Sequence, residues 1–167
     1  MTTAPHDLHI RPARAGDDEA IWQVILPVIR AGETNALPPD MDRDAALAYW
    51  RAPGHAVFVA ERDGLVLGSY FLHANQQGGG AHVANCAYAT HEAARGQGIA
   101  RAMAEHSLAE ARVRGFRAMQ FNFVVSSNER AVRLWQSLGF AIVGTLPEAF
   151  LHPRLGYVDA FVMLRAV

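Results

Sequence analysis

Residues 94–103 read ARGQGIARAM and place two glycines directly before an alanine-rich helical segment. A plain turn between a strand and a helix is one explanation of Gly96 and Gly98, and it stays open here. The two glycines also remove the Cβ atoms that would keep a ligand away from the backbone. Unpaired N–H groups at a helix N-terminus favour anions. Together with Arg95, the segment therefore predicts an anion site with a pyrophosphate as its natural ligand.

The residues around this segment alternate between strand and helix patterns. Asp63-Gly64 predicts a hairpin within 56–74, and 126–129 (SSNE) has the form of a capping box made by Ser126 and Glu129. Further strands are expected at 8–13, 82–90, 118–125, 141–146 and 157–164, and a loop at 75–82. Four helices are expected. The first is capped by Asp17 and runs to about residue 31, and the second spans 43–51. The third ends at Gly115 and the fourth at Gly139. This mixture predicts an α/β or α+β domain.

Length and composition predict one domain, residues 1–167, with 51% apolar and 19% charged residues. The net charge of −1 and the lack of a basic run argue against nucleic acid as a partner. No apolar run reaches membrane length, and Cys86 is the single cysteine, so a cytoplasmic protein without disulfides is expected. The eight histidines show no metal-ligand spacing, so no metal is expected.

Two nucleotide-binding patterns do not fit the glycine segment. A phosphate-binding P-loop requires Lys-Ser/Thr after its last glycine, whereas Ile99 and Ala100 follow Gly98. A dinucleotide fingerprint requires a third glycine or an alanine where this chain has Arg101.

Residues 95–100 (RGQGIA) instead resemble the R/Q-x-x-G-x-G/A acetyl-coenzyme A signature of the GNAT N-acetyltransferase superfamily. NERAVRLWQSLGF, residues 128–140, resembles the second motif of the same family, and the order of elements is similar from residue 8 to residue 164. A weaker resemblance points to the branch that acetylates small cyclic amino acids such as proline analogues. The family implies a mixed, mostly antiparallel sheet of about seven strands flanked by about four helices. It also implies two central strands, here 82–90 and 118–125, that splay apart.

The resemblance implies where acetyl-CoA binds. Main-chain N–H groups of the glycine segment would wrap the pyrophosphate, and the end of strand 82–90 would bind the pantetheine arm through its backbone. The side chain of Asn128 would face the arm, cap the next helix, or do both. The implied acetyl-CoA residues are Tyr88, Thr90, Arg95, Gly96, Gln97, Gly98, Ile99, Ala100 and Asn128.

The expected catalytic groups depart from the family pattern. Trp135 stands where many members have a tyrosine that protonates the leaving thiolate, and an indole N–H can donate a hydrogen bond but no proton. A core role for Trp135 stays open. Strand 82–90 has no carboxylate, so His82 is a candidate base, and Asn85 and Asn122 are candidates to polarise the carbonyl or hold the amine. Structural amides are the alternative for both. Cys86 is expected to be a small buried side chain.

The acceptor pocket is expected in two irregular segments, 33–42 and 147–157. Its candidate residues are Glu33, Thr34, Asn35, Phe150, His152 and Tyr157. The resemblance implies an enzyme that transfers the acetyl group of acetyl-CoA directly, in a ternary complex, to a primary or secondary amine of a small molecule or amino acid. A non-catalytic acyl-CoA-binding module and a protein lysine or N-terminal acetyltransferase stay open as alternatives. The oligomeric state is left open between a monomer and a homodimer.

Overall fold

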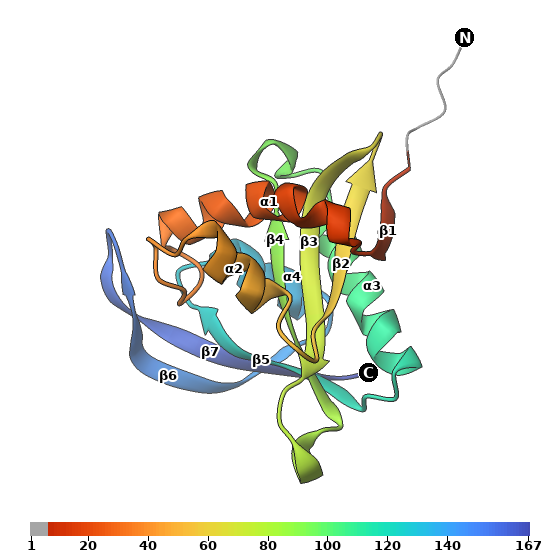
Figure 1. Ribbon diagram of the computed structural model, residues 1–167. Coiled ribbons are helices and arrows are strands. Elements are labelled where there is room, and N and C mark those ends of the chain that lie inside the picture. Colours follow the sequence, from red (N-terminus) through yellow and green to blue (C-terminus); the bar gives the residue numbers. More distant parts are fainter. Residues whose placement is uncertain (1–6) are drawn as a thin grey trace.

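The computed structural model describes residues 7–167, which form a seven-stranded sheet and four α-helices. The strands lie in the order β1-β2-β3-β4-β5-β7-β6, and only the β4–β5 pair is parallel. The strands are β1 (His9–Pro12), β2 (Ala56–Arg62), β3 (Leu65–Ala74), β4 (Val83–Thr90), β5 (Ala118–Val125), β6 (Ala141–His152) and β7 (Gly156–Ala166). The mixed, mostly antiparallel sheet confirms the expected fold class (Figure 1).

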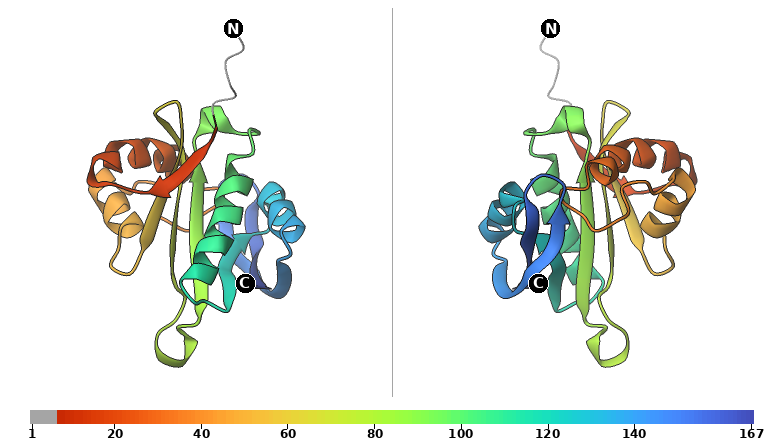
Figure 2. Two further views of the ribbon diagram at one scale, coloured as in Figure 1. Left: turned by 90° about the vertical axis from the view of Figure 1, so that its right-hand side faces the viewer. Right: turned by 90° about the vertical axis from the view of Figure 1, so that its left-hand side faces the viewer.

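The helices are α1 (Asp18–Ala31), α2 (Arg43–Trp50), α3 (Ile99–Val113) and α4 (Glu129–Ser137). Figure 2 shows α1 and α2 on one face of the sheet and α3 and α4 on the other. Each face has its own core, because apolar side chains alternate across the strands. Ile21, Ile25 and Ile29 lie four residues apart and bury one stripe of α1, and Gly32 ends that helix at φ 61°.

Local signals in the sequence predicted several turns correctly. Asp63 and Gly64 join β2 to β3 with positive φ at both positions, as a type I′ hairpin requires. Gly115 (φ 82°) and Gly139 (φ 88°) follow the ends of α3 and α4. The expected loop at 75–82 contains a short 3-10 turn at Gly78–Gly80.

Three local predictions are wrong. The capping box at the start of α4 is not formed, because Asn128 is the N-cap and its side chain accepts from the N–H of Ala131. Asp17 precedes α1 without capping it, because its carboxylate binds both Nη atoms of Arg11 at 2.8 and 2.9 Å. That guanidinium lowers the pKa of Asp17 to about 2. The segment 147–157 is not a loop, since β6 continues to His152 and turns into β7, although the β6–β7 pairing shifts register between Leu146 and Phe150.

None of the helices between residues 7 and 167 has the length and apolar character needed to cross a bilayer.

Candidate active site

The β4–β5 pair opens in the middle of the sheet. Only two pairs of the described residues join these strands, Val83 with Ala118 and Ala84 with Met119. Beyond them the strands diverge, as Figure 1 shows. The backbone edge of β4 from Cys86 to Thr90 therefore faces open space instead of a neighbouring strand, which leaves its polar groups available to a ligand. The predicted splay of these two strands is present.

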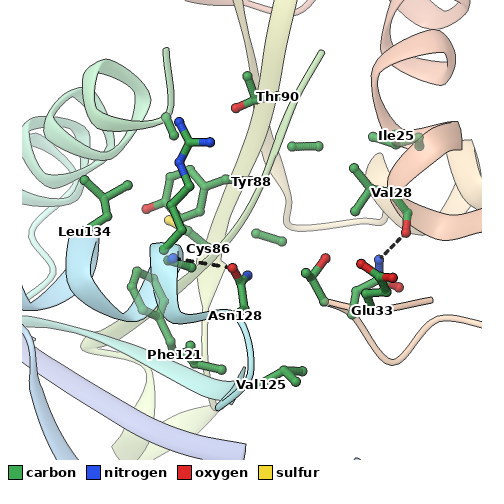
Figure 3. Close-up of a pocket in the computed structure, with 18 of the residues that line it drawn as sticks. Ile25, Val28, Glu33, Cys86, Tyr88, Thr90, Phe121, Val125, Asn128 and Leu134 are labelled. Carbon is green, nitrogen blue, oxygen red and sulfur yellow. Dashed lines mark hydrogen bonds between the residues drawn. The ribbon is translucent and has the colours of Figure 1, made fainter. Parts of the chain in front are cut away.

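A cavity of about 760 Å³ fills this opening and extends to the glycine segment. Figure 3 shows its two sides: Tyr88, Phe121 and Leu134 lie on one, and Ile25, Val28 and Glu33 lie on the other. The first group comes from β4, β5 and α4, and the second comes from α1 and the loop after it. The cavity thus reaches across the sheet from the α3–α4 face to the α1–α2 face.

The glycine segment forms one end of the cavity. Gly96 and Gly98 both have φ 79°, a left-handed conformation that glycine adopts without strain. Gly98 precedes the first helical residue of α3, and no side chain caps this helix. Among the described residues, five main-chain N–H groups of this segment have no hydrogen-bond acceptor: those of Gly96, Gly98, Ile99, Ala100 and Arg101. This row of donors at a helix N-terminus is suited to bind a phosphate group.

Arginine side chains strengthen the positive potential at this end. Arg95, Arg101 and Arg130 line the cavity, and a Cβ built on Gly96 would lie 3.7 Å from Nη2 of Arg130. Arg101 already binds Oγ of Ser137 at 2.7 Å. In the described part of the chain, the guanidinium groups of Arg95 and Arg130 have no carboxylate partner, so both are free to pair with an anion.

Gln97 does not line the cavity, unlike the other members of the predicted loop. Its Oε1 accepts from Arg62 at 3.0 Å and its Nε2 donates to the carbonyl oxygen of Ala93 at 3.2 Å. The side chain therefore holds the loop in place from outside the cavity.

Cys86, which is buried, and Tyr88, which is partly buried, form one wall of the cavity. The Tyr88 hydroxyl lies 2.7 Å from Oγ of Ser107, and that oxygen lies 2.7 Å from the carbonyl oxygen of Ala104. Since the carbonyl can only accept, Ser107 donates to it and Tyr88 donates to Ser107. Burial raises the pKa of Tyr88 well above its ordinary value. Burial likewise raises the pKa of the Cys86 thiol to about 12, so Cys86 is a neutral side chain at pH 7.

Of the predicted catalytic residues, one lines the cavity and the others do not. Trp135 lines the cavity, is 8% exposed, and its ring lies 4.7 Å from that of Phe121. His82, Asn85 and Asn122 do not line the cavity. Asn85 and Asn122 are nevertheless brought together, because the side-chain oxygen of Asn75 accepts from their Nδ2 atoms at 3.3 and 2.7 Å. His82 is exposed, three residues before Asn85.

A pair of imidazoles lies on the same face of the sheet as Asn85. His73 is directly opposite Asn85 in the β3–β4 pairing, and its ring centroid is 4.7 Å from that of His55. Nδ1 of His55 is 3.1 Å from the carbonyl oxygen of Trp50, which fixes Nδ1 as the protonated nitrogen. Burial, followed by the neighbouring His55, lowers the pKa of His73. His73 is therefore a neutral imidazole at pH 7.

Some of the predicted acceptor residues line a cavity and others do not. Glu33, Thr34 and Asn35 line the cavity, and Asn35 is held by a bond from its Nδ2 to the carbonyl oxygen of Val28 at 3.3 Å. His152 lines a second cavity that adjoins the first. Phe150 and Tyr157 line neither: the Phe150 ring packs 6.2 Å from Phe123, and Tyr157 is exposed.

The sequence reasoning missed Arg130 and Arg154. Arg130 lies within the second motif, two residues after Asn128, and its position in the first turn of α4 was a signal that a cation could face the glycine segment. Arg154 lies in the β6–β7 turn, and nothing in the sequence shows that this turn meets residue 33. Among the described residues, no group of three or more histidine, cysteine, aspartate or glutamate side chains could hold a metal ion.

Comparisons with known proteins agree with this geometry. The sequence model of the acetyltransferase (GNAT) family matches residues 22–140, well over half of the chain, and the chain belongs to this family. The structure of a GCN5-related N-acetyltransferase from Kribbella flavida is similar with a TM-score of 0.92 and 43% identity, over 98% of this chain and 100% of that one. The yncA structure from Salmonella typhimurium, solved with its cofactor acetyl-CoA, is 25% identical with a TM-score of 0.83, over 95% of this chain and 93% of that one.

A curated relative is N-acetyltransferase aca1 of Schizosaccharomyces pombe, which is 33% identical over 98 residues. The match covers 58% of this chain and 47% of the relative, so the chain spans about half the length of that protein.

Proposed function

We propose that the chain is an N-acetyltransferase that moves the acetyl group of acetyl-CoA to an amine of a small molecule or amino acid. One observation carries the proposal: the opening between β4 and β5 forms one cavity with the unpaired N–H groups at the start of α3. A ligand with a pyrophosphate at one end and a thin, amide-bearing arm at the other fits such a shape. We also propose that residues 1–167 are a single acetyltransferase domain, of which residues 1–6 lie outside the described part.

The described residues suit acetyl-CoA. The N–H groups of the glycine segment, with Arg95 and Arg130, would hold the pyrophosphate. The β4 edge at Tyr88 and Thr90 would bind the arm through its backbone. Asn128 can serve two purposes, because its Oδ1 caps α4 through the N–H of Ala131 while its Nδ2 stays available to donate to the arm.

The chemistry is direct transfer. The amine nitrogen attacks the thioester carbon, the new C–N bond forms as the C–S bond breaks, and the thiolate leaves while the nitrogen loses one proton. Trp135 lines the cavity, and its indole N–H would donate to the departing sulfur. A thiol has a pKa near 8.5, so the thiolate can take the proton that the nitrogen loses, either directly or through water.

The acceptor would enter from the α1–α2 face. The loop after α1 lines this side of the cavity with Glu33, Thr34 and Asn35. Ala87 lines the cavity, and Asn85 shares its face of β4 two residues earlier. We therefore place Asn85, with Asn122 held to it through Asn75, at the entrance for the amine, and His82 farther away.

Proton chemistry argues against a protein lysine as the acceptor. A lysine side chain is neutral about once in 2,500 at pH 7, whereas the α-amino group at a peptide N-terminus is neutral roughly once in ten. β4 offers no carboxylate to remove a proton. An acceptor that is already partly neutral therefore needs less help from this site than a protein lysine does.

The test is thiol release from acetyl-CoA with a panel of amino acids, cyclic analogues, polyamines and lysine peptides, with products identified by mass spectrometry. Transfer to amino acids with a higher kcat/KM than to any lysine peptide supports the proposal. Binding of acetyl-CoA without release for any amine would instead identify a non-catalytic acyl-CoA-binding module.

A further inference from the structure

The second cavity, of about 400 Å³, adjoins the acetyl-CoA cavity on the acceptor side. Its lining residues are Glu33, Thr34, Ser127, Asn128, His152, Arg154 and Leu155. Glu33, Thr34 and Asn128 line both cavities. A ligand in the second cavity can therefore reach into the first from the side opposite the glycine segment.

An ion pair of opposite charges crosses this cavity. Nη2 of Arg154, in the β6–β7 turn, lies 2.8 Å from Oε1 of Glu33, in the loop after α1. The Arg154 side chain is 74% exposed, and exposed ion pairs of this kind contribute little to stability. A ligand that carries both charges can replace each partner of this pair at small cost.

Two hydrogen-bond donors in the same cavity have no partner among the described residues. The Ser127 hydroxyl oxygen is buried and forms no hydrogen bond. Nδ1 of His152 accepts from the N–H groups of Arg154 and Leu155 at 3.2 Å each, so this nitrogen is unprotonated. The hydrogen of the neutral imidazole then lies on Nε2, which has no protein acceptor.

We propose that this cavity binds the carboxylate of an α-amino acid, which defines the acceptor class of the proposed acetyltransferase. Arg154 pairs with the carboxylate, and Ser127 and the Nε2–H of His152 donate to it. Glu33 then faces the amino group, and because Glu33 lines both cavities, that nitrogen is directed toward the opening between β4 and β5. The inference rests on the proposed function, but carboxylate binding is measurable without acetyl transfer.

The kinetic test compares each amino acid with its decarboxylated amine, for example proline with pyrrolidine. Arg154→Gln should lower the ratio of kcat/KM for the acid over that for the amine by about 10- to 100-fold, the effect of losing a charge-assisted hydrogen bond. Ser127→Ala should lower the same ratio by a smaller factor. The matched control is Arg133→Gln, because Arg133 is also 74% exposed and paired with a glutamate, Glu129, but lines neither cavity.

A binding test separates this inference from the proposed function. Calorimetry with CoA present, so that no acetyl group can be transferred, should show amino-acid binding to the wild-type protein and to Arg133→Gln, and a 10-fold or greater loss for Arg154→Gln. Equal binding by Arg154→Gln and the wild type would overturn the carboxylate site even if acetyl transfer is observed. Binding that follows this pattern without any transfer would support the site and contradict the proposed function.

Discussion

Tyr88 on β4 and Trp135 on α4 face each other with ring centroids 5.0 Å apart, at the wall of the acetyl-CoA cavity. The Tyr88 hydroxyl is turned to Ser107, whereas the Trp135 indole N–H is free of protein partners in the described chain. Tyr88 therefore packs the wall of the cavity, whereas we propose that Trp135 donates a hydrogen bond to the ligand.

Replacing Trp135 with phenylalanine keeps an aromatic ring and removes the N–H. We expect kcat to fall about 3- to 10-fold, the effect of one neutral hydrogen bond, while the Kd of acetyl-CoA stays the same. Stopped-flow thiol release and calorimetry measure the two quantities. Trp22→Phe is the control for lost volume, because Trp22 is equally buried but outside the cavity. An equal fall in kcat for both variants would assign Trp135 to packing alone.

Gly98→Glu should abolish acetyl-CoA binding, since it places a carboxylate in the proposed phosphate site. Gly54→Glu is a close control: Gly54 has φ 86° and Gly98 has φ 79°, and an added Cβ meets no atom within 4 Å at either position. Both variants carry similar backbone strain, of order 1 kcal/mol. Calorimetry should show binding by Gly54→Glu and none by Gly98→Glu, and micromolar affinity of Gly98→Glu would contradict the assignment of the loop.

Cys86 should neither react with alkylating reagents in the folded protein nor act as a nucleophile. Because the pKa of its thiol is about 12, the native protein should resist iodoacetamide at pH 8 and react only after unfolding. Cys86→Ala should lower kcat by less than tenfold, whereas a covalent nucleophile would lose several orders of magnitude. Intact-mass measurement after mixing with acetyl-CoA should find no acetylated protein, and a stable acetyl adduct lost in Cys86→Ala would establish a covalent route instead.

Two half-buried histidines should make stability depend on pH. Burial lowers the pKa of His73 and of His106 below 6.5 in the folded protein. Below the unfolded pKa the unfolded chain therefore binds more protons, so the free energy of unfolding should fall as the pH drops from 7.5 to 5.5. Urea titrations should show a smaller fall for His73→Gln, while exposed His82→Gln should match the wild type. If the free energy of unfolding fell equally with pH in all three proteins, His73 would not contribute to the pH dependence.

The sequence was informative where the signal is local. The glycine segment and the α4 motif each lie within one stretch of chain, and the positive φ of Gly96 and Gly98 follows from the turn that they form. Strands were predicted at 141–146 and 157–164, but the continuation of β6 to His152 was missed, because β6 is an edge strand, exposed at most positions, so no alternation of apolar residues marks it. A positive φ at Glu148 also interrupts the strand pattern.

Contacts between side chains that are far apart in the chain could not be predicted from the sequence. Asn122 was predicted from its place on one of the two splayed strands, but the pairing of β5 with β7 shifts between Phe121 and Val124, next to this residue. The roles of Asn85 and Asn122 in catalysis stay predictions. The contact of Arg154 with Glu33 joins two turns far apart in the chain, and only the folded structure brings them together.

The most direct test of the central claim is an NMR experiment with acetyl-CoA labelled with carbon-13 in its acetyl carbonyl. With an amino acid present, the thioester signal should be replaced by an amide signal in an amount equal to the thiol released. Without an amine, the thioester signal should persist. Conversion to free acetate alone, or no conversion with any amine, would contradict direct acetyl transfer in the opening between β4 and β5.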